Sequence, residues 1–68
     1  MSEKWKIWKW DGRYLKGKLV KTYKSQNMAL NYLDKSKFCD KLVKHTKNEF
    51  FIEDENGTPT GLLERIEK

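Results

Sequence analysis

Three tryptophans and two intervening lysines make up most of the segment WKIWKW, which occupies residues 5–10. Successive side chains of an extended strand point to opposite faces, so a strand here places Trp5 and Ile7 on one side and Trp8 and Trp10 on the other. Only one side can face a core. A small sheet covered by one helix therefore leaves some indoles partly exposed beside basic residues.

The rest of the pattern predicts an α+β fold. We expect a small antiparallel sheet of four to five strands with one helix packed on one face. The expected elements are strands at 4–10, 18–23, 41–46 and 49–54, and a helix at 26–35 with Ser25 as its N-cap. Residues 61–67 alternate as in a strand, which we favour, although Thr60 could also cap a short helix there. The order is then ββαβββ or ββαββα.

Each element has an expected core face. Strict alternation groups Leu19, Lys21 and Tyr23 on one face of their strand and Val20 and Thr22 on the other. The same rule turns Phe50 and Ile52 away from Phe51. Helical spacing gathers the apolar side chains into one arc that should cover the sheet, made of Met28, Ala29, Leu30, Tyr32 and Leu33. We expect Phe38 to return the chain to the core.

The size of the chain predicts a single domain, residues 1–68, that buries only about 60% of its unfolded surface. Most of its three Trp, three Tyr and three Phe residues are then needed for the core. Cys39 is the only cysteine, so we expect no intrachain disulfide and a small buried thiol near the helix end. The N-terminus lacks the apolar segment of a signal peptide, which favours a cytoplasmic location. No apolar run reaches the roughly 20 residues that span a membrane.

The charge is unevenly distributed along the chain, whose net charge is +5. Residues 1–24 hold eight Lys and Arg against two acids, whereas residues 48–68 hold two against six. If these segments separate in space, the molecule is electrically two-sided and a polyanion would approach the first hairpin. The alternative is a surface that mixes charges for solubility.

The sequence does not indicate an enzyme, a metal site or a cofactor. On one extended segment Cys39 and His45 would lie about 20 Å apart, too far for a nucleophile and its base. Zinc normally requires four ligands with closely spaced pairs. An EF-hand loop opening at Asp54 would need glycine and glutamate where Pro59 and Arg65 stand, so residues 54–57 are an ordinary turn. The acidic residues 49 and 53–55 lack an apolar pocket that would separate an acid from a base.

Basic and aromatic residues in the first hairpin indicate nucleic-acid binding instead. Lysines and arginine pair with phosphates, and indoles stack on bases. The candidate residues are Lys6, Trp8, Lys9, Trp10, Arg13, Lys16, Lys18 and Lys21. A two-stranded ribbon could enter a major groove or follow a single strand. Because arginine, which reads guanine, is scarce, we expect contacts to DNA or RNA that are mostly to the backbone and weakly sequence-specific.

Two other interpretations remain open. The indoles could fill the core while the lysines face solvent, with Trp10 the most exposed. The chain could also be a protein interaction module or a small regulator or inhibitor that uses Trp8, Trp10 or Tyr14 as anchors. Opposite charges at the two ends would suit an acidic protein partner or a homodimer.

Residues 5–35 carry a family resemblance. Trp10-Asp11-Gly12-Arg13 stands at the first turn, and residues 19–25 lead into Ala29, Tyr32 and Leu33 of the helix. This segment resembles the DNA-binding domains of the AP2 type, which include the arm-binding domains of tyrosine recombinases. Such domains lay a three-stranded sheet in a DNA groove, so the resemblance implies that Trp8, Trp10, Arg13 and Lys21 lie near DNA. The match covers under half of the chain, and a third strand before the helix is not evident.

Overall fold

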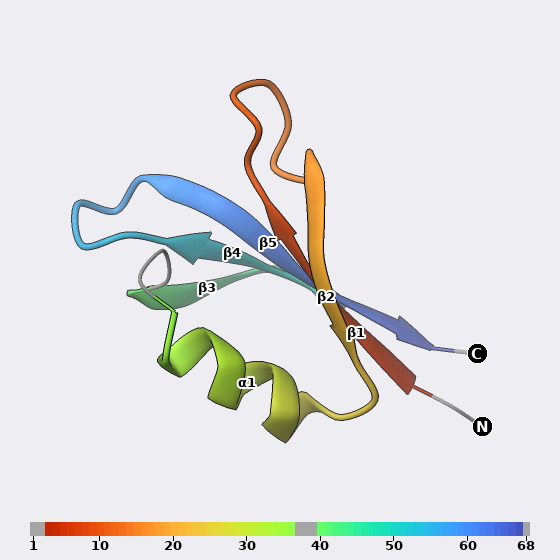
Figure 1. Cartoon of the computed structure of the whole chain (residues 1–68). Coiled ribbons are helices and arrows are strands. Elements are labelled where there is room, and N and C mark those ends of the chain that lie inside the picture. Colours follow the sequence, from red (N-terminus) through yellow and green to blue (C-terminus); the bar gives the residue numbers. More distant parts are fainter. Residues whose placement is uncertain (1–2, 37–39, 68) are drawn as a thin grey trace.

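The computed structural model describes residues 3–36 and 40–67 and has the predicted α+β class. Its elements follow the order ββαβββ (Figure 1). They are β1 (Glu3–Lys9), β2 (Lys18–Tyr23), α1 (Gln26–Asp34), β3 (Lys41–Thr46), β4 (Glu49–Glu53) and β5 (Pro59–Glu67). The five strands form one antiparallel sheet in the order β2-β1-β5-β4-β3. The last segment is therefore a strand, as favoured.

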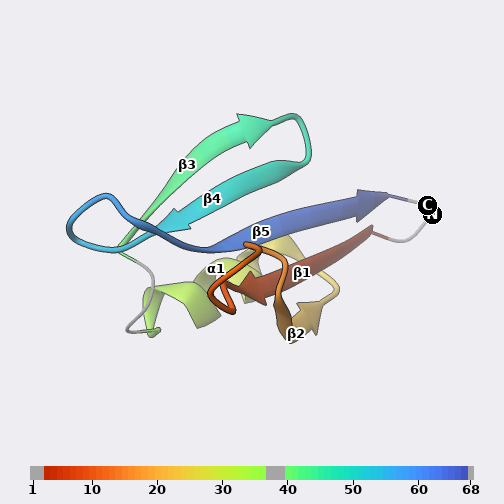
Figure 2. The ribbon, with the colours of Figure 1, turned by 90° about the horizontal axis from the view of Figure 1, so that it is seen from above.

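The N-terminal strand lies inside the sheet, between β2 and the C-terminal strand β5. Figure 2 shows β1 and β5 side by side, with the start of β1 beside the end of β5. In this register Lys6 lies opposite Glu64 and Glu3 opposite Glu67. The basic first hairpin and the acidic last strand thus share one sheet. The charged segments do not separate in space, and the predicted electrical two-sidedness is not found.

An ionic cluster joins the free ends of β1 and β5. Arg65 Nε donates to Glu3 Oε1 at 2.6 Å, and its guanidinium also pairs with Glu67. The same guanidinium lies 5.9 Å from the Trp5 ring centroid. The indole N–H of Trp5 and then Arg65 lower the pKa of Glu3. The Trp5 N–H itself has no acceptor within hydrogen-bond geometry among the described residues. Arg65 thereby offsets the repulsion between the two facing glutamates.

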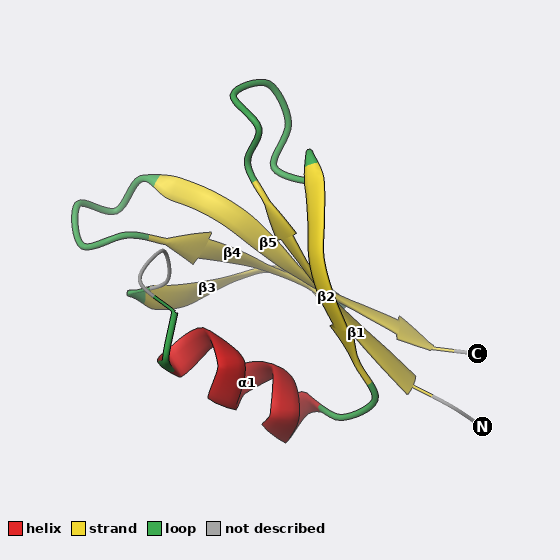
Figure 3. Ribbon diagram, viewed as in Figure 1, coloured by secondary structure: helices red, strands yellow, loops and turns green. Residues whose placement is uncertain are grey.

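The core lies between α1 and one face of the sheet, where the helix packs over β1 and β2 (Figure 3). Its buried members are Trp5, Ile7, Ala29, Leu33, Ile52 and Leu63. The prediction that Trp5 and Ile7 share one face is thus confirmed, and the structure shows that this face is the core side. Phe50 packs against the same cluster, while Phe51 contacts His45 on the other face, as the alternation predicts.

The helix begins where the sequence indicates. Ser25 has extended backbone angles, and its side-chain oxygen accepts from the Met28 N–H at 3.3 Å, which satisfies one of the free amides of the first turn. Ala29 and Leu33 are buried. Met28 is 52% exposed, so its assignment to the core arc is wrong. The sheet meets a narrower stripe of this short helix than the sequence pattern suggests.

Strand β2 departs from strict alternation. Leu19 lies opposite Trp8 and Lys21 opposite Ile7, so the register shifts at Val20. Because directly opposed residues point to the same face, Leu19 and Tyr23 lie on opposite faces, and their predicted grouping is wrong. Val20 and Tyr23 both pack against the core. A β-bulge inserts one residue and reverses the faces beyond it, which the sequence pattern alone does not reveal.

The turns between β3 and β4 and between β4 and β5 lie where the sequence predicts them. Lys47 and Asn48 join β3 to β4. The Asp54 carboxylate accepts from the Asn56 and Thr58 amides, and Gly57 has the positive φ that this turn requires. The expectations for Phe38 and Cys39 concern positions outside the described residues. Within the ranges 3–36 and 40–67, no helix is long and apolar enough to span a membrane.

Candidate functional site

The sheet face opposite α1 carries a row of apolar side chains across all five strands. Cross-strand register aligns Leu19, Trp8, Leu62, Phe51 and Val43, one from each strand in sheet order. No helix among the described residues covers this face, which we call the open face (Figures 1 and 3). Leu62 is buried, Trp8 and Phe51 are half-buried, and the two ends of the row are exposed. A continuous apolar stripe of this kind is typical of a contact surface.

A polar network holds the Trp8 indole in place. Its N–H donates to Glu64 Oε1 at 3.1 Å, and Lys16 Nζ donates to Glu64 Oε2 at 2.7 Å. Lys16 also lies 3.0 Å from Glu49 Oε2. Burial alone would raise the pKa of Glu64, but the hydrogen bonds from Lys16 and Trp8 outweigh it and lower that pKa. Lys16 thus pairs with two acids of the open face, and the charge of Lys6 also acts on Glu64.

The loop between β1 and β2, residues 10–17, projects from the sheet on the side opposite α1 (Figure 1). We call it the hairpin tip. Asp11 Oδ1 accepts from the backbone amides of Arg13 at 2.8 Å and Tyr14 at 3.0 Å, which lowers the pKa of Asp11. Gly12 has a φ of 100°, and a Cβ at Gly17 would lie 2.3 Å from Asp11 Cγ. These contacts give the tip a defined conformation.

The tip presents two aromatic rings to solvent. Trp10 is 47% exposed and Tyr14 is 64% exposed. The backbone N–H of Trp10 donates to the backbone oxygen of Thr60 at 3.0 Å, which continues the β1–β5 ladder by one pair. Strand alternation then places the Trp10 side chain on the face of Trp8. Arg13, also exposed, lies 5.8 Å from the Tyr14 ring centroid. Accessible rings therefore lie beside accessible cations.

The predicted binding residues fall into three groups. Lys6 and Trp8 belong to the open face, while Trp10, Arg13 and Lys16 lie in the hairpin tip, from which Lys16 reaches Glu64 of the open face. The third group lies on the α1 side of the sheet and comprises Lys9, Lys18 and Lys21. Lys18 is opposite Lys9, and Lys21 lies 5.8 Å from the Tyr23 ring centroid. The structure thus brings only part of the predicted set together.

Sequence reasoning missed the contribution of the C-terminal half to this face. His45 stacks on Phe51 with ring centroids 4.4 Å apart, and Leu62 fills the centre of the row. Glu49 and Glu64 carry the carboxylates that form ion pairs with Lys16. The alternation of residues 61–67 could have placed Leu62 and Glu64 on one face, but nothing local to the sequence sets β5 beside β1.

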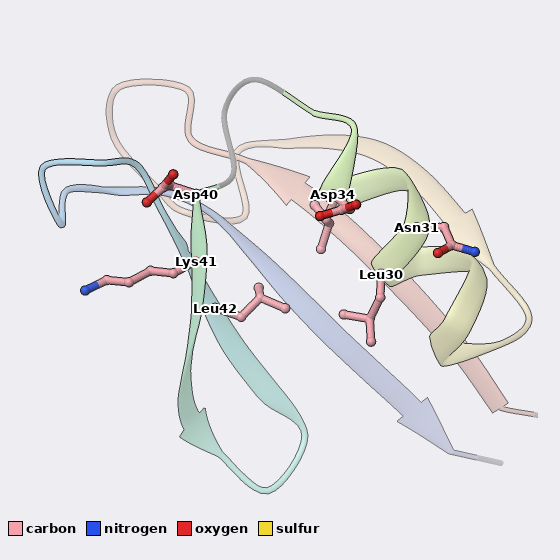
Figure 4. Close-up of a pocket in the computed structure, with 7 residues that line it drawn as sticks. Leu30, Asn31, Asp34, Asp40, Lys41 and Leu42 are labelled. Carbon is pink, nitrogen blue, oxygen red and sulfur yellow. The ribbon is translucent and has the colours of Figure 1, made fainter.

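A pocket of about 360 Å³ separates α1 from β3. Leu30 and Leu42 point toward one another across it, whereas Lys41 points away (Figure 4). Asp34 and Asp40 also line it. The described residues contain no group of three or more His, Cys, Asp or Glu side chains that could hold a metal ion. The pocket has a mixed apolar and acidic lining and no exposed aromatic ring, so we place the candidate site on the open face and hairpin tip.

The Glu64 network predicts a pH dependence of stability. Folding lowers the pKa of Glu64 below 4.5. The ionised carboxylate therefore stabilises the folded state above pH 4.5, and this stabilisation is lost as the pH falls through the pKa that Glu64 has in the folded protein. Folding raises the pKa of Lys16 above 10.5, so its contribution is lost only at alkaline pH. We expect the melting temperature to fall between about pH 5 and pH 3, and less so in Glu64→Gln. Thermal melts by circular dichroism across this range measure it.

The matched control is Glu55→Gln, because Glu55 is an exposed acid in the β4–β5 turn. At neutral pH Glu64→Gln should cost less than about 1 kcal/mol, since Lys16 remains in contact with solvent. A pH profile of Glu64→Gln that overlays the wild-type profile would contradict the assigned role of this carboxylate.

Comparison with known proteins provides no family for this chain. No protein-family model, no curated protein and no solved structure matches it. The resemblance of residues 5–35 to AP2-type domains stays a prediction, and in the structure two strands precede α1.

Proposed function

We propose that this protein is a non-catalytic nucleic-acid-binding domain that uses the open face and the hairpin tip. The observation that supports the proposal most directly is the pairing of exposed aromatic rings, Trp10 and Tyr14, with exposed cations in a loop of defined conformation. Rings stack on bases and cations pair with phosphates, which is the combination that nucleic-acid surfaces require. A preformed loop also lowers the entropy cost of binding.

The electrostatics of the surface are compatible with a polyanion. The acids nearest the Trp8 ring, Glu49 and Glu64, are both paired with Lys16. Lys6 lies 5.9 Å from the Trp8 ring centroid, and Lys4 follows the same face of β1. The chain as a whole carries a net charge of +5. Lys6 and Lys16 together balance the charges of Glu49 and Glu64, so a phosphate meets no net negative charge from these four groups.

The residue types favour backbone contacts over base reading. The chain has two arginines, and Arg65 is engaged by Glu3 and Glu67 at the far end of β5. Only Arg13 remains at the candidate site for bidentate recognition of guanine. We therefore expect affinity that varies little with base sequence and depends strongly on salt.

A salt titration tests the proposal. The logarithm of the association constant for labelled oligonucleotides should fall linearly with the logarithm of salt concentration. Arg13→Ala and Lys6→Ala should each reduce the slope by about 0.7 to 0.9, one phosphate contact per cation. Fluorescence anisotropy measures both quantities. Lys35→Ala is the control, because Lys35 is an exposed cation at the end of α1, on the other side of the sheet.

Loss of slope in Lys35→Ala equal to that in Arg13→Ala would show that binding follows net charge and not this surface. Absence of binding to single-stranded and duplex DNA and RNA at low salt would refute the proposed function.

One observation favours a second candidate, a protein interaction module. The two ends of the apolar row are aliphatic, with Leu19 45% and Val43 37% exposed, and aliphatic rows suit protein surfaces better than nucleotides. Such a partner would be displaced by Leu19→Lys or Val43→Lys with little dependence on salt. Pull-down from the source cells with these two variants and with Met28→Lys as control distinguishes the two functions.

A further inference from the structure

We infer that the preferred ligand of this surface is a single-stranded nucleic acid whose bases stack across the open face on Trp10, Trp8 and the Phe51–His45 pair. The inference rests on the proposed function and adds to it the strandedness of the ligand and the path it follows. It requires three properties of the surface: rings along one path, an apolar row that suits bases better than phosphates, and cations beside the rings.

The rings form a path that starts at the hairpin tip and turns across the sheet at Trp8. Trp10 follows the last residue of β1, and its backbone pairing with Thr60 extends the strand geometry, so its Cα lies about 6.6 Å from that of Trp8. Trp8 is followed in the row by Leu62 and then by Phe51, on which His45 stacks. Every base has two π faces, so a line of rings accepts successive bases whatever their identity.

The sheet is wider than the two-stranded ribbon that fits a major groove by itself. β1 is paired along its whole length with β5, from Glu3–Glu67 to Lys9–Gly61, and over most of it with β2. The first hairpin is therefore not a free two-stranded ribbon that could enter a major groove, since only the tip extends beyond the sheet. A duplex keeps its base faces stacked inside and would set phosphates against the apolar row. A single strand can turn its bases onto that row.

Polar contacts prepare the central ring for stacking. The Glu64 carboxylate accepts the Trp8 N–H, and Lys16 holds the same carboxylate, so the indole is fixed before a ligand arrives. Lys6 lies 5.9 Å from the ring centroid and Lys4 lies farther along the same face of β1. A base on Trp8 would thus have an ammonium group within reach of its phosphate. At the other end of the path, the exposed Arg13 would pair with the phosphate of the nucleotide on Trp10.

Anisotropy titrations with defined probes test the inference. The probes are labelled oligothymidylate and oligouridylate of about ten nucleotides and a mixed-sequence blunt duplex of about twenty base pairs, each at two salt concentrations. We expect at least about tenfold tighter binding to one of the two single strands than to the duplex. The oligothymidylate and oligouridylate arms show whether the strand is DNA or RNA.

Substitutions locate the stacking. Trp10→Ala should weaken single-strand binding by about 5- to 100-fold while leaving the salt slope unchanged, because a ring contributes no phosphate contact. Met28→Ala is the matched control, since Met28 is equally exposed on the α1 side. Circular dichroism confirms folding. If Trp10→Ala does not fold, Trp10→Leu replaces it, because leucine keeps apolar bulk without a π face.

Amide chemical shifts of the wild-type protein provide a readout that needs no variant. On adding oligothymidylate or oligouridylate, the affected amides should belong to β1, β5, β4, β3 and the hairpin tip, and not to α1. Duplex binding as tight as single-strand binding, or shifts confined to α1, would overturn this inference while the proposed function stands. Failure of every probe to bind at low salt would overturn both.

Discussion

Gly61→Ala is expected to destabilise the protein by about 3 kcal/mol or more. A Cβ at this position would lie 2.2 Å from the backbone oxygen of Trp8, and the carbonyl carbon and Lys9 Cα are also near. The oxygen belongs to β1, an inner strand of the sheet, so it cannot move without disturbing the β1–β5 ladder. A chain of this length has about 3 to 10 kcal/mol of total stability, so the variant should be largely unfolded or melt far below the wild type. Urea unfolding followed by circular dichroism measures the loss.

Gly57→Ala separates this steric effect from a general effect of replacing glycine. Gly57 has a φ of 81°, and a Cβ there meets nothing within 4 Å. We expect a loss of only about 1 kcal/mol from the left-handed backbone. Equal losses in the two variants would mean that the close approach of β1 and β5 at Gly61 does not limit stability.

Ile7→Ala should cost about 2 to 5 kcal/mol, the range for deleting a large buried side chain from a core that cannot fully collapse. Ile7 is completely buried beneath α1, opposite Leu63 of β5. It lies in the strand to which both β2 and β5 are paired, so a cavity there weakens three strands and the helix together. Urea denaturation should show a lower midpoint with an unchanged slope if folding stays cooperative.

Leu19→Ala is the control for Ile7→Ala. Leu19 is an aliphatic residue of similar size on the neighbouring strand, but it lies on the open face and is nearly half exposed. Its loss should change stability by no more than about 0.5 kcal/mol. If Leu19→Ala lowers the free energy of unfolding as much as Ile7→Ala does, the assignment of the principal core to the α1 side of the sheet would be contradicted.

The local elements were predictable because their signals lie within a few residues. The alternation around Trp5 and Ile7 predicted a strand and placed these two side chains on one face, and the structure confirms both. Which face is the core was decided by the position of α1. Ser25 predicted the start of α1 through a hydrogen bond that spans three residues. The bulge at Val20 was not predictable, because it arises from pairing with β1 and leaves no local signal.

The candidate site was predictable only in part. The aromatic and basic residues of the first hairpin were found from sequence, and the structure shows Trp10 exposed as expected. Lys16 was assigned to the same set as Lys21, yet the fold ties Lys16 to Glu49 and Glu64 and places Lys21 on the α1 side. These partners lie far from Lys16 along the chain, so only the strand order reveals them.

The amino-acid pattern by itself determined the secondary structure, the α+β class and the identity of the residues available for binding. Periodicity and capping depend on neighbours in the chain, so the sequence contains them directly. Only the tertiary structure decided which strands are adjacent and which face α1 leaves open. Insertion of β1 between β2 and β5 set Glu64 beside Trp8 and extended the apolar row from Leu19 to Val43, because cross-strand neighbours are chosen by the packing of the whole sheet.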